Sequence, residues 1–177
     1  MLKGKSVTIR TIAHRDIQEL AQHLSDVKSS GDFLPTQLLS ESEIENRLKE
    51  NGYISETFSR YLITDTSDQI IGSIWCFPSI PYFSAIEVGY HIFDETNRGN
   101  GYIPEALALF TSFLFNANPI HRVELRIATE NKASERVALK LGFTHEGTHR
   151  HAAFCGGKMH DMKTYAMLRE EWQRLTH

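Results

Sequence analysis

A glycine-rich turn between a predicted strand and a predicted helix constrains this chain more than any other feature. After the alternating run at residues 86–93, the chain reads Asn97-Arg98-Gly99-Asn100-Gly101-Tyr102-Ile103-Pro104. Gly99 and Gly101 lack a Cβ, so they can adopt positive φ and let an anion approach the main chain. Pro104 suits a first helical turn, where a missing N–H leaves no bond unmade. Unpaired N–H groups and a helix dipole attract anions, so this turn is predicted to cradle a phosphate.

The same residues exclude two other phosphate-binding loops. A Walker-type nucleotide site needs Gly-Lys-Ser/Thr, which this turn lacks, and a dinucleotide fingerprint needs a third glycine where Pro104 stands. A Gly-x-Gly turn alone also occurs as an ordinary tight turn. The turn therefore needs a second motif before it indicates a cofactor.

The composition is that of one globular domain spanning residues 1–177, with 41% apolar and 23% charged residues. A net charge of −3 and an isoelectric point near 6.3 argue against broad nucleic-acid binding. Cys76 and Cys155 are far apart, which favours free thiols in a reduced compartment over a disulfide or a zinc site. No segment has the pattern of a signal peptide or a membrane span, so a cytoplasmic location is expected.

Periodic apolar residues predict an α/β chain of alternating strands and helices. Strands are expected at residues 7–9, 60–65, 69–77, 84–93, 122–128, 143–151 and 158–168, and helices at 16–24, 40–51, 103–116 and 131–141. A loop or broken helix is expected at residues 31–39, and Trp172 is expected in a short tail. The pairs Asp16 with Glu19 and Ser40 with Glu43 have the spacing of reciprocal helix caps.

The predicted strand before the turn carries a candidate general base. Its apolar side chains share one face, and the other face carries Glu87, Gly89 and His91. Glu87 could accept a proton directly or through water, or it could be an ordinary solvated strand residue. The pattern leaves both interpretations open.

A second motif follows the turn, in the stretches Asn131-Lys132-Ala133-Ser134 and Lys140-Leu141-Gly142-Phe143. Together with the strand, turn, helix and strand before it, this motif resembles the GNAT acetyltransferase superfamily. Within that superfamily, residues 134–143, residues 161–172 and the overall length are most similar to the RimJ/RimL-type branch, which acetylates the N-termini of ribosomal proteins. The resemblance implies a mixed, mostly antiparallel central sheet, splayed between its fourth and fifth strands, with helices on both faces.

The resemblance also implies a site for acetyl-CoA as cosubstrate. In such enzymes the backbone amides of the glycine-rich turn bind the pyrophosphate, and the matching residues here are Arg98, Gly99, Asn100, Gly101, Tyr102 and Ile103. Ile103 departs from the small residue usual at its position. The pantetheine arm would pair with the strand edge at Ile92 and Phe93, and Asn131 and Ser134 would contact it through their side chains.

For catalysis, the resemblance implies Ser134 as the proton donor to the departing thiolate, since Ala138 stands where many relatives carry a tyrosine. Ser134 could equally cap its helix. Glu87 is the predicted base, with His149 or His151 in reserve because imidazole titrates near neutrality. The backbone N–H of Phe93 is the predicted oxyanion donor. No familiar metal-ligand spacing is present, so no metal is predicted.

These residues predict direct attack of a bound primary amine on the thioester. An α-amino group has a pKa near 8, so a modest base suffices, which favours a protein N-terminus, as of a ribosomal protein, as acceptor. Alternatives are a small amine, such as a polyamine, an aminoglycoside-like compound or an amino-acid analogue, and a non-catalytic acetyl-CoA-binding module. Neither a nucleic acid nor a membrane is expected as a direct partner, and relatives suggest a homodimer.

Overall fold

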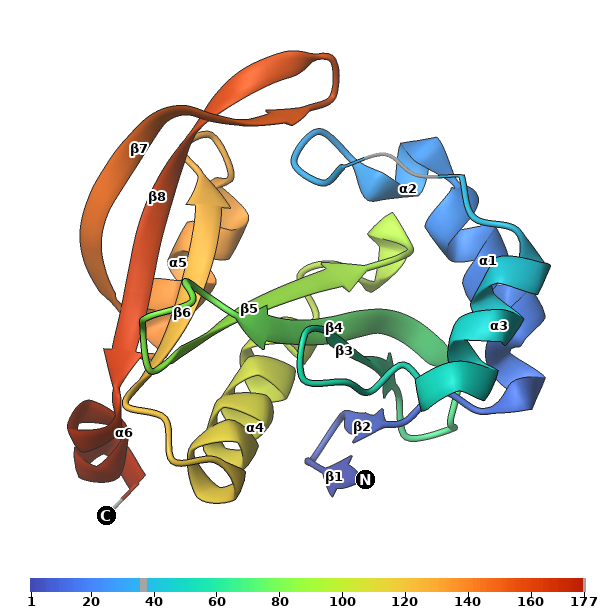
Figure 1. Ribbon diagram of the computed structural model, residues 1–177, viewed down its shortest axis with the longest axis horizontal. Coiled ribbons are helices and arrows are strands. Elements are labelled where there is room, and N and C mark those ends of the chain that lie inside the picture. The colour runs from blue at the N-terminus through green and yellow to red at the C-terminus, as the bar shows by residue number, and fades with distance from the viewer. Residues whose placement is uncertain (36–37, 177) are drawn as a thin grey trace.

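The computed structural model describes residues 1–35 and 38–176, and it contains one eight-stranded sheet with the order β1-β2-β3-β4-β5-β6-β8-β7 (Figure 1). The strands are β1 (Leu2–Lys3), β2 (Thr8–Arg10), β3 (Ser59–Thr64), β4 (Ile70–Pro78), β5 (Ala85–Ile92), β6 (Arg122–Ala128), β7 (Thr144–Cys155) and β8 (Lys158–Leu168). The helices are α1 (Ile17–Ser25), α2 (Val27–Ser30), α3 (Glu41–Asn51), α4 (Tyr102–Ala117), α5 (Lys132–Lys140) and α6 (Arg169–Thr176), with short 3₁₀ turns at His14–Asp16 and Glu95–Asn97.

The sheet is mixed because one of its strand pairs is parallel. β5 and β6 pair in parallel, and only at Ala85 with Arg122, Ile86 with Val123 and Glu87 with Glu124, whereas every other neighbouring pair is antiparallel. Beyond Glu87 and Glu124 the two strands diverge, and we call this divergence the fork (Figure 1). The predicted splay between the fourth and fifth strands is confirmed; the added two-residue β1 makes these strands β5 and β6.

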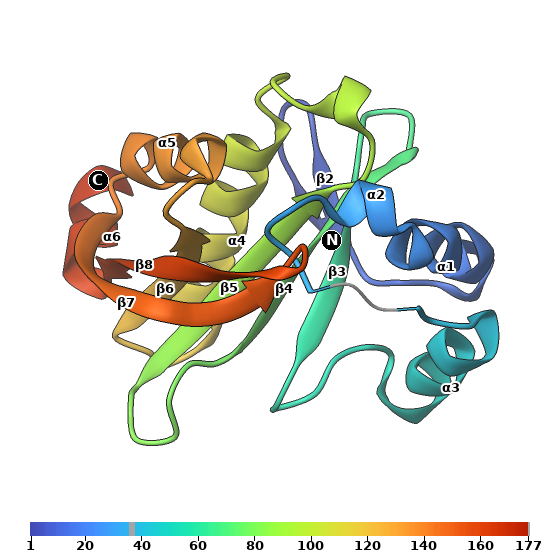
Figure 2. The ribbon, with the colours of Figure 1, turned by 90° about the horizontal axis from the view of Figure 1, so that it is seen from above.

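Helices cover both faces of the sheet, as predicted. One face, here the α4 face, packs against α4 and α5 through a large core that includes Leu107, Phe110 and Leu125. The opposite face, here the α1 face, packs against α1 and α3 through a smaller core that includes Leu20, Ile44 and Leu62. In Figure 2, α4 and α5 are neighbours on one side of the molecule, and α1 and α3 are neighbours on the other.

Most predicted elements are confirmed to within a few residues, but two predictions at helix ends are wrong. Asp16 does not cap α1 with Glu19; its carboxylate accepts a hydrogen bond from the Ala13 N–H at 2.7 Å and pairs with Arg10. Trp172 lies in α6 rather than in a tail. Its ring stacks on Phe115, and its indole N–H donates to the Ser112 hydroxyl at 3.0 Å. These contacts fix α6 against α4.

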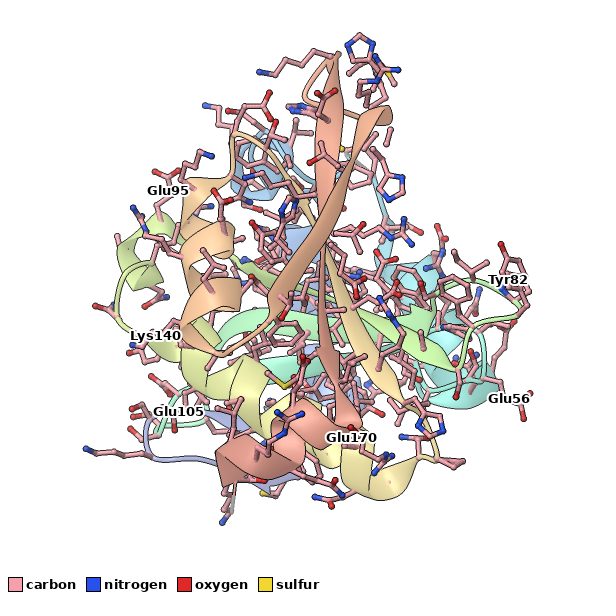
Figure 3. All side chains as sticks on the ribbon, turned by 90° about the vertical axis from the view of Figure 1, so that its left-hand side faces the viewer. Glu56, Tyr82, Glu95, Glu105, Lys140 and Glu170 are labelled. Carbon is pink, nitrogen blue, oxygen red and sulfur yellow. The ribbon has the colours of Figure 1, made fainter. Side chains whose placement is uncertain are left out.

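The remaining irregular segments lie at the surface. Of the predicted loop at residues 31–39, the described part has no helix or strand, and residues 36–37 lie outside the described residues. The connection between β4 and β5 carries Tyr82, a residue that is 82% exposed, and Figure 3 shows it at the edge of the molecule opposite Glu95. Among the described helices, none is both long and apolar enough to cross a membrane.

Candidate functional site

The glycine-rich turn presents a row of unpaired backbone amides where α4 begins. Gly99 and Gly101 have φ of 81° and 82°, so both adopt the left-handed conformation that the sequence predicted. A Cβ at either position would meet no described atom within 4 Å, so the space beside the turn is open. The N–H groups of residues 99–103 donate to no other described group, and they lie at the positive end of the α4 dipole. This arrangement can bind a diphosphate.

Arg98 stands at the start of this row but differs from its neighbours. Its backbone N–H donates to the Glu95 carbonyl at 3.0 Å, closing the 3₁₀ turn before it. Its guanidinium pairs with the exposed Glu95 carboxylate, also at 3.0 Å. The Arg98 amide, predicted as the first phosphate donor, is therefore already engaged, and the row of unpaired amides begins at Gly99.

The end of β5 corrects the prediction for Phe93. Its N–H donates to the Ile71 carbonyl of β4 at 3.1 Å, so this amide is not available to an oxyanion. Neighbouring residues of a strand direct their backbone groups to opposite sides. The N–H and carbonyl of Ile92 therefore face the fork, where β6 no longer pairs with β5.

At the start of α5, Asn131 rather than Ser134 is the capping residue. The Asn131 side-chain oxygen accepts the Ser134 N–H at 3.1 Å. The Ser134 hydroxyl is left beside the phenol of Tyr90, which extends from the α4 face of β5. The Tyr90 hydroxyl is buried without a hydrogen-bond partner of normal geometry among the described residues. Burial raises the pKa of Tyr90, and the nearby Ser134 hydroxyl lowers it in part.

Glu87 lies at the base of the fork, on the α1 face. Its carboxylate accepts a hydrogen bond from Arg126 Nε of β6 at 2.8 Å. Burial raises the pKa of Glu87 above the usual 4.5, and the charge of Arg126 opposes this shift without cancelling it. Glu87 is thus a half-buried carboxylate, strengthened as a base, at the point where the strands part.

The structure adds neighbours of Glu87 that the sequence analysis missed. Glu124 is only 2% exposed, and it accepts hydrogen bonds from Ser79 and, at 2.8 Å, from Arg122 Nε. Arg126 lies 3.6 Å from the other Glu124 oxygen and so joins the two carboxylates. The sequence did contain a signal for these neighbours, because residues 122, 124 and 126 are all charged and alternate with apolar residues along one strand.

The C-terminal histidines do not form one cluster. His149 and His151, with Arg150, line a shallow hollow of about 530 Å³ on β7. His160 is instead buried, with its Nε2 3.1 Å from the Cys155 carbonyl. No group of three or more histidine, cysteine or carboxylate side chains within residues 1–35 and 38–176 is placed to hold a metal ion.

One loop bridges the two sets of strands that diverge at the fork. The loop after α2 brings Phe33 edge-on to His160, with ring centroids 5.7 Å apart, and Asp32 lies against Gly156 of the turn between β7 and β8. Figure 1 shows this loop reaching toward the tip of the β7–β8 hairpin. The loop after α2 and the tip of the β7–β8 hairpin, which belong to the two sets of strands that part at the fork, are therefore in contact.

The candidate groups are divided between the two faces of the sheet. Glu87 and Arg126 lie on the α1 face, whereas the turn, Tyr90 and Ser134 lie on the α4 face. The candidate proton acceptor, Glu87, and the candidate proton donor, Ser134, thus stand on opposite sides of the fork. This division suits transfer of a group from a phosphate-bearing donor bound at α4 to an acceptor deprotonated by Glu87.

Comparison with known proteins identifies the family of this chain. The family model described as an acetyltransferase (GNAT) domain matches residues 6–144. The chain is 31% identical to the uncharacterized N-acetyltransferase YoaA of Bacillus subtilis over 101 residues, which cover 57% of this chain and 56% of that protein. It is 25% identical to the ribosomal-protein-serine acetyltransferase of Escherichia coli over 169 residues, covering 93% and 94% of the two chains.

Among solved structures, the spermidine N-acetyltransferase of Vibrio cholerae in complex with CoA and spermine has a TM-score of 0.81 to this chain. The match covers 94% of this chain and 98% of that one at 18% identity, and it shows a shared fold. The family match spans the fork, the glycine-rich turn and the start of α5. The chain therefore belongs to the GNAT acetyltransferase family, and it is an N-acetyltransferase that uses acetyl-CoA.

Proposed function

We propose that the acceptor is the α-amino group of a protein N-terminus, as in ribosomal-protein acetylation, and that this amine attacks the thioester directly. The observation that carries the proposal is Glu87, a carboxylate of raised pKa held by Arg126 at the base of the fork. The relative from Escherichia coli, aligned over 93% of this chain, is named a ribosomal-protein-serine acetyltransferase, which supports the same acceptor class.

The described residues fit acetyl-CoA. The unpaired amides of residues 99–103 would hold its diphosphate, and the backbone carbonyl of Ile92 would accept a hydrogen bond from its pantetheine arm. Ser134 and the unused side-chain N–H of Asn131 would contact the same arm. When bound, acetyl-CoA supplies the thioester that the amine attacks. Ile103 can still contribute its N–H despite its larger side chain.

Glu87 accepts a proton from the ammonium form of the acceptor. An α-amino group with a pKa near 8 is already partly neutral at physiological pH, so it needs only a modest base, whereas a lysine-like amine near 10.4 needs more help. Arg126 keeps the carboxylate oriented toward the fork. His149 and His151 remain the reserve bases on the neighbouring hairpin.

On the α4 face, the backbone N–H of Ile92 replaces that of Phe93 as the proposed donor to the carbonyl oxygen, on which negative charge develops. Such a donor lowers the activation barrier by about 3 kcal/mol. Ser134 donates a proton to the departing thiolate as the carbon–sulfur bond breaks and the carbonyl re-forms, and its hydroxyl is restored by the second proton that the attacking nitrogen releases. The buried hydroxyl of Tyr90, which has no other partner among the described residues, positions the adjacent Ser134 hydroxyl.

A small polyamine is the second candidate acceptor. Glu87, Glu124 and Glu146 place three carboxylates near β6, and cationic amines are attracted by such groups. Arg122 and Arg126 neutralise most of this charge, which makes the site less suited to a polycation. A non-catalytic acetyl-CoA-binding module is the remaining alternative, and it predicts binding without thiol release.

Release of free CoA thiol should be measured with ribosomal-protein N-terminal peptides, polyamines and aminoglycosides as acceptors. The proposal expects the highest kcat/KM with a peptide, and a blocked N-terminus on that peptide should abolish release. Preference for a polyamine would favour the second candidate, and binding of acetyl-CoA with no release would favour the module. We further propose one domain over residues 1–177, a cytoplasmic location, consistent with two buried unpaired cysteines, and a homodimer.

A further inference from the structure

Arg60 of β3 is a half-buried cation without a counterion. Its guanidinium makes no hydrogen bond and no ion pair with any side chain in residues 1–35 and 38–176. Burial lowers the pKa of Arg60 to about 10, which still leaves it charged at neutral pH. Desolvating a charge without pairing it costs free energy, so such a group is rarely kept without a use.

Aromatic side chains hold Arg60 in place. The guanidinium carbon lies 5.0 Å from the ring centroid of Trp75 and 5.6 Å from that of Phe58. Each cation–π contact is attractive and restricts the plane of the guanidinium. Gly89 makes room for this arrangement, because a Cβ there would lie 2.4 Å from the Trp75 ring.

Within the part of the chain that the structure describes, no carboxylate pairs with Arg60. The ionisable groups that affect its charge most are Tyr53, whose hydroxyl is buried without a partner among the described residues, and the cation Arg47. His91 faces the same space, and its pKa is lowered to about 4, mainly by burial, so it is neutral at physiological pH. The environment therefore favours an anion brought by a ligand and opposes a second cation.

Arg60 and Glu87 share the α1 face. Arg60 is opposite Trp75, Trp75 is opposite Gly89, and Gly89 is two residues from Glu87 along β5. Two strand spacings and two residue rises separate their Cα atoms by roughly 12 Å. An amine at Glu87 and an anion at Arg60 therefore belong to different residues of an extended acceptor, since each residue spans about 3.3 Å.

We propose that Arg60 binds an acidic side chain at the second or third residue of the acceptor peptide. This inference rests on the proposed N-terminal acceptor and narrows it to peptides with an aspartate or glutamate near their N-terminus. It also separates the two candidate acceptors. A polyamine would place a second ammonium group beside the uncompensated Arg60, where it would be repelled.

The kinetic test uses three peptides that differ only at the third residue, as Glu, Gln or Lys. Wild-type enzyme should show a KM about 10-fold lower for the Glu peptide, the value of one charge-assisted contact, and the highest KM for the Lys peptide. Arg60→Gln should remove the preference without changing the KM of the Gln peptide, and Arg60→Lys should restore part of it. Arg174→Gln is the matched control, because Arg174 is an exposed arginine of α6, on the other side of the sheet.

A binding test without acetyl-CoA separates this inference from the proposed function. In a Trp172→Phe background Trp75 is the only tryptophan, so its fluorescence should respond to the Glu peptide but not the Gln peptide. Arg60→Gln should abolish that response, and its melting temperature shows whether the variant is folded. If the response occurs but no peptide is acetylated, the inference stands and the proposed function fails. Equal responses and equal KM for the Glu and Gln peptides would overturn the inference, as would spermidine outperforming every peptide.

Discussion

The α4 face and the α1 face of this enzyme are built in different ways. On the α4 face, the proposed acetyl-CoA cradle consists of backbone amides in five consecutive residues, 99–103, beside one helix end. On the α1 face, the groups proposed to handle the acceptor are side chains of separate strands, including Arg60, Glu87 and Arg126. Backbone geometry can be kept by many side chains, whereas an assembled pocket changes with each residue. One sheet can therefore combine a binding site for the acetyl donor that depends on backbone geometry with a binding site for the acceptor that changes with individual side chains.

The largest expected effect tests the α1 face alone. Glu87→Gln should lower kcat by about 100-fold or more, because the general base is lost while the hydrogen bond to Arg126 is kept. Calorimetric titration should show unchanged acetyl-CoA affinity, since the cradle lies on the other face. Wild-type kcat/KM should fall as the pH drops through the raised pKa of Glu87, and the variant should lack that acid limb.

Glu146→Gln is a suitable control, because Glu146 is an exposed carboxylate that pairs with Arg122 at 2.5 Å. It should leave kcat within about two-fold of wild type, as expected for a surface ion pair. If Glu87→Gln also kept full turnover with every acceptor, the proposed base would be wrong and the reserve histidines would be tested next.

The second prediction tests the α4 face alone. Gly101→Ala should weaken acetyl-CoA binding about 10-fold, because a residue with a Cβ pays about 1–2 kcal/mol for the left-handed φ of 82°. Its KM for the acceptor should not change. Gly147→Ala is the matched control: Gly147 lacks positive φ, and a Cβ there meets nothing within 4 Å. Equal acetyl-CoA affinity in the two variants would contradict the cradle.

A smaller effect is expected where Ser134 meets Tyr90. Ser134→Ala should lower kcat about 10-fold and leave α5 intact, because its cap uses the Ser134 backbone N–H rather than the hydroxyl. Tyr90→Phe should lower kcat only a few-fold, since Tyr90 acts through Ser134. If so, the double variant should resemble Ser134→Ala alone, because the two changes remove one function. Additive losses, measured as rates of thiol release, would show that Tyr90 acts independently.

The smallest expected effect is on stability. The His91 Nε2–H donates to the Ser29 carbonyl at 2.7 Å, and the pKa of His91 is lowered from 6.5 to about 4, chiefly by burial. The unfolded chain therefore binds more protons between these values, so stability is lost as the pH falls from about 6.5 to 4. Thermal melting of wild type should approach that of His91→Gln over this window. A constant difference between the two would show that His91 does not titrate there.

The difference between the two faces also explains what the sequence could predict. The turn was predicted correctly because Gly99, Gly101 and Pro104 determine backbone geometry locally. The fork followed from family resemblance, and its position between two predicted strands was correct. The Phe93 amide was assigned wrongly because its direction depends on pairing with Ile71, which is distant in sequence. Likewise, the lack of a counterion for Arg60 depends on which residues surround it after folding, and its neighbours in the sequence do not indicate this.

The fork also determines how the reactants can approach. A continuous sheet would separate its two faces by a row of hydrogen bonds, but β5 and β6 stop pairing beyond Glu87 and Glu124. The two reactants can therefore approach the fork from opposite faces of the sheet, so that binding of one need not block binding of the other. In the proposed arrangement CoA would leave along α4 and the acetylated product past α1, so release of one product would leave the route of the other open.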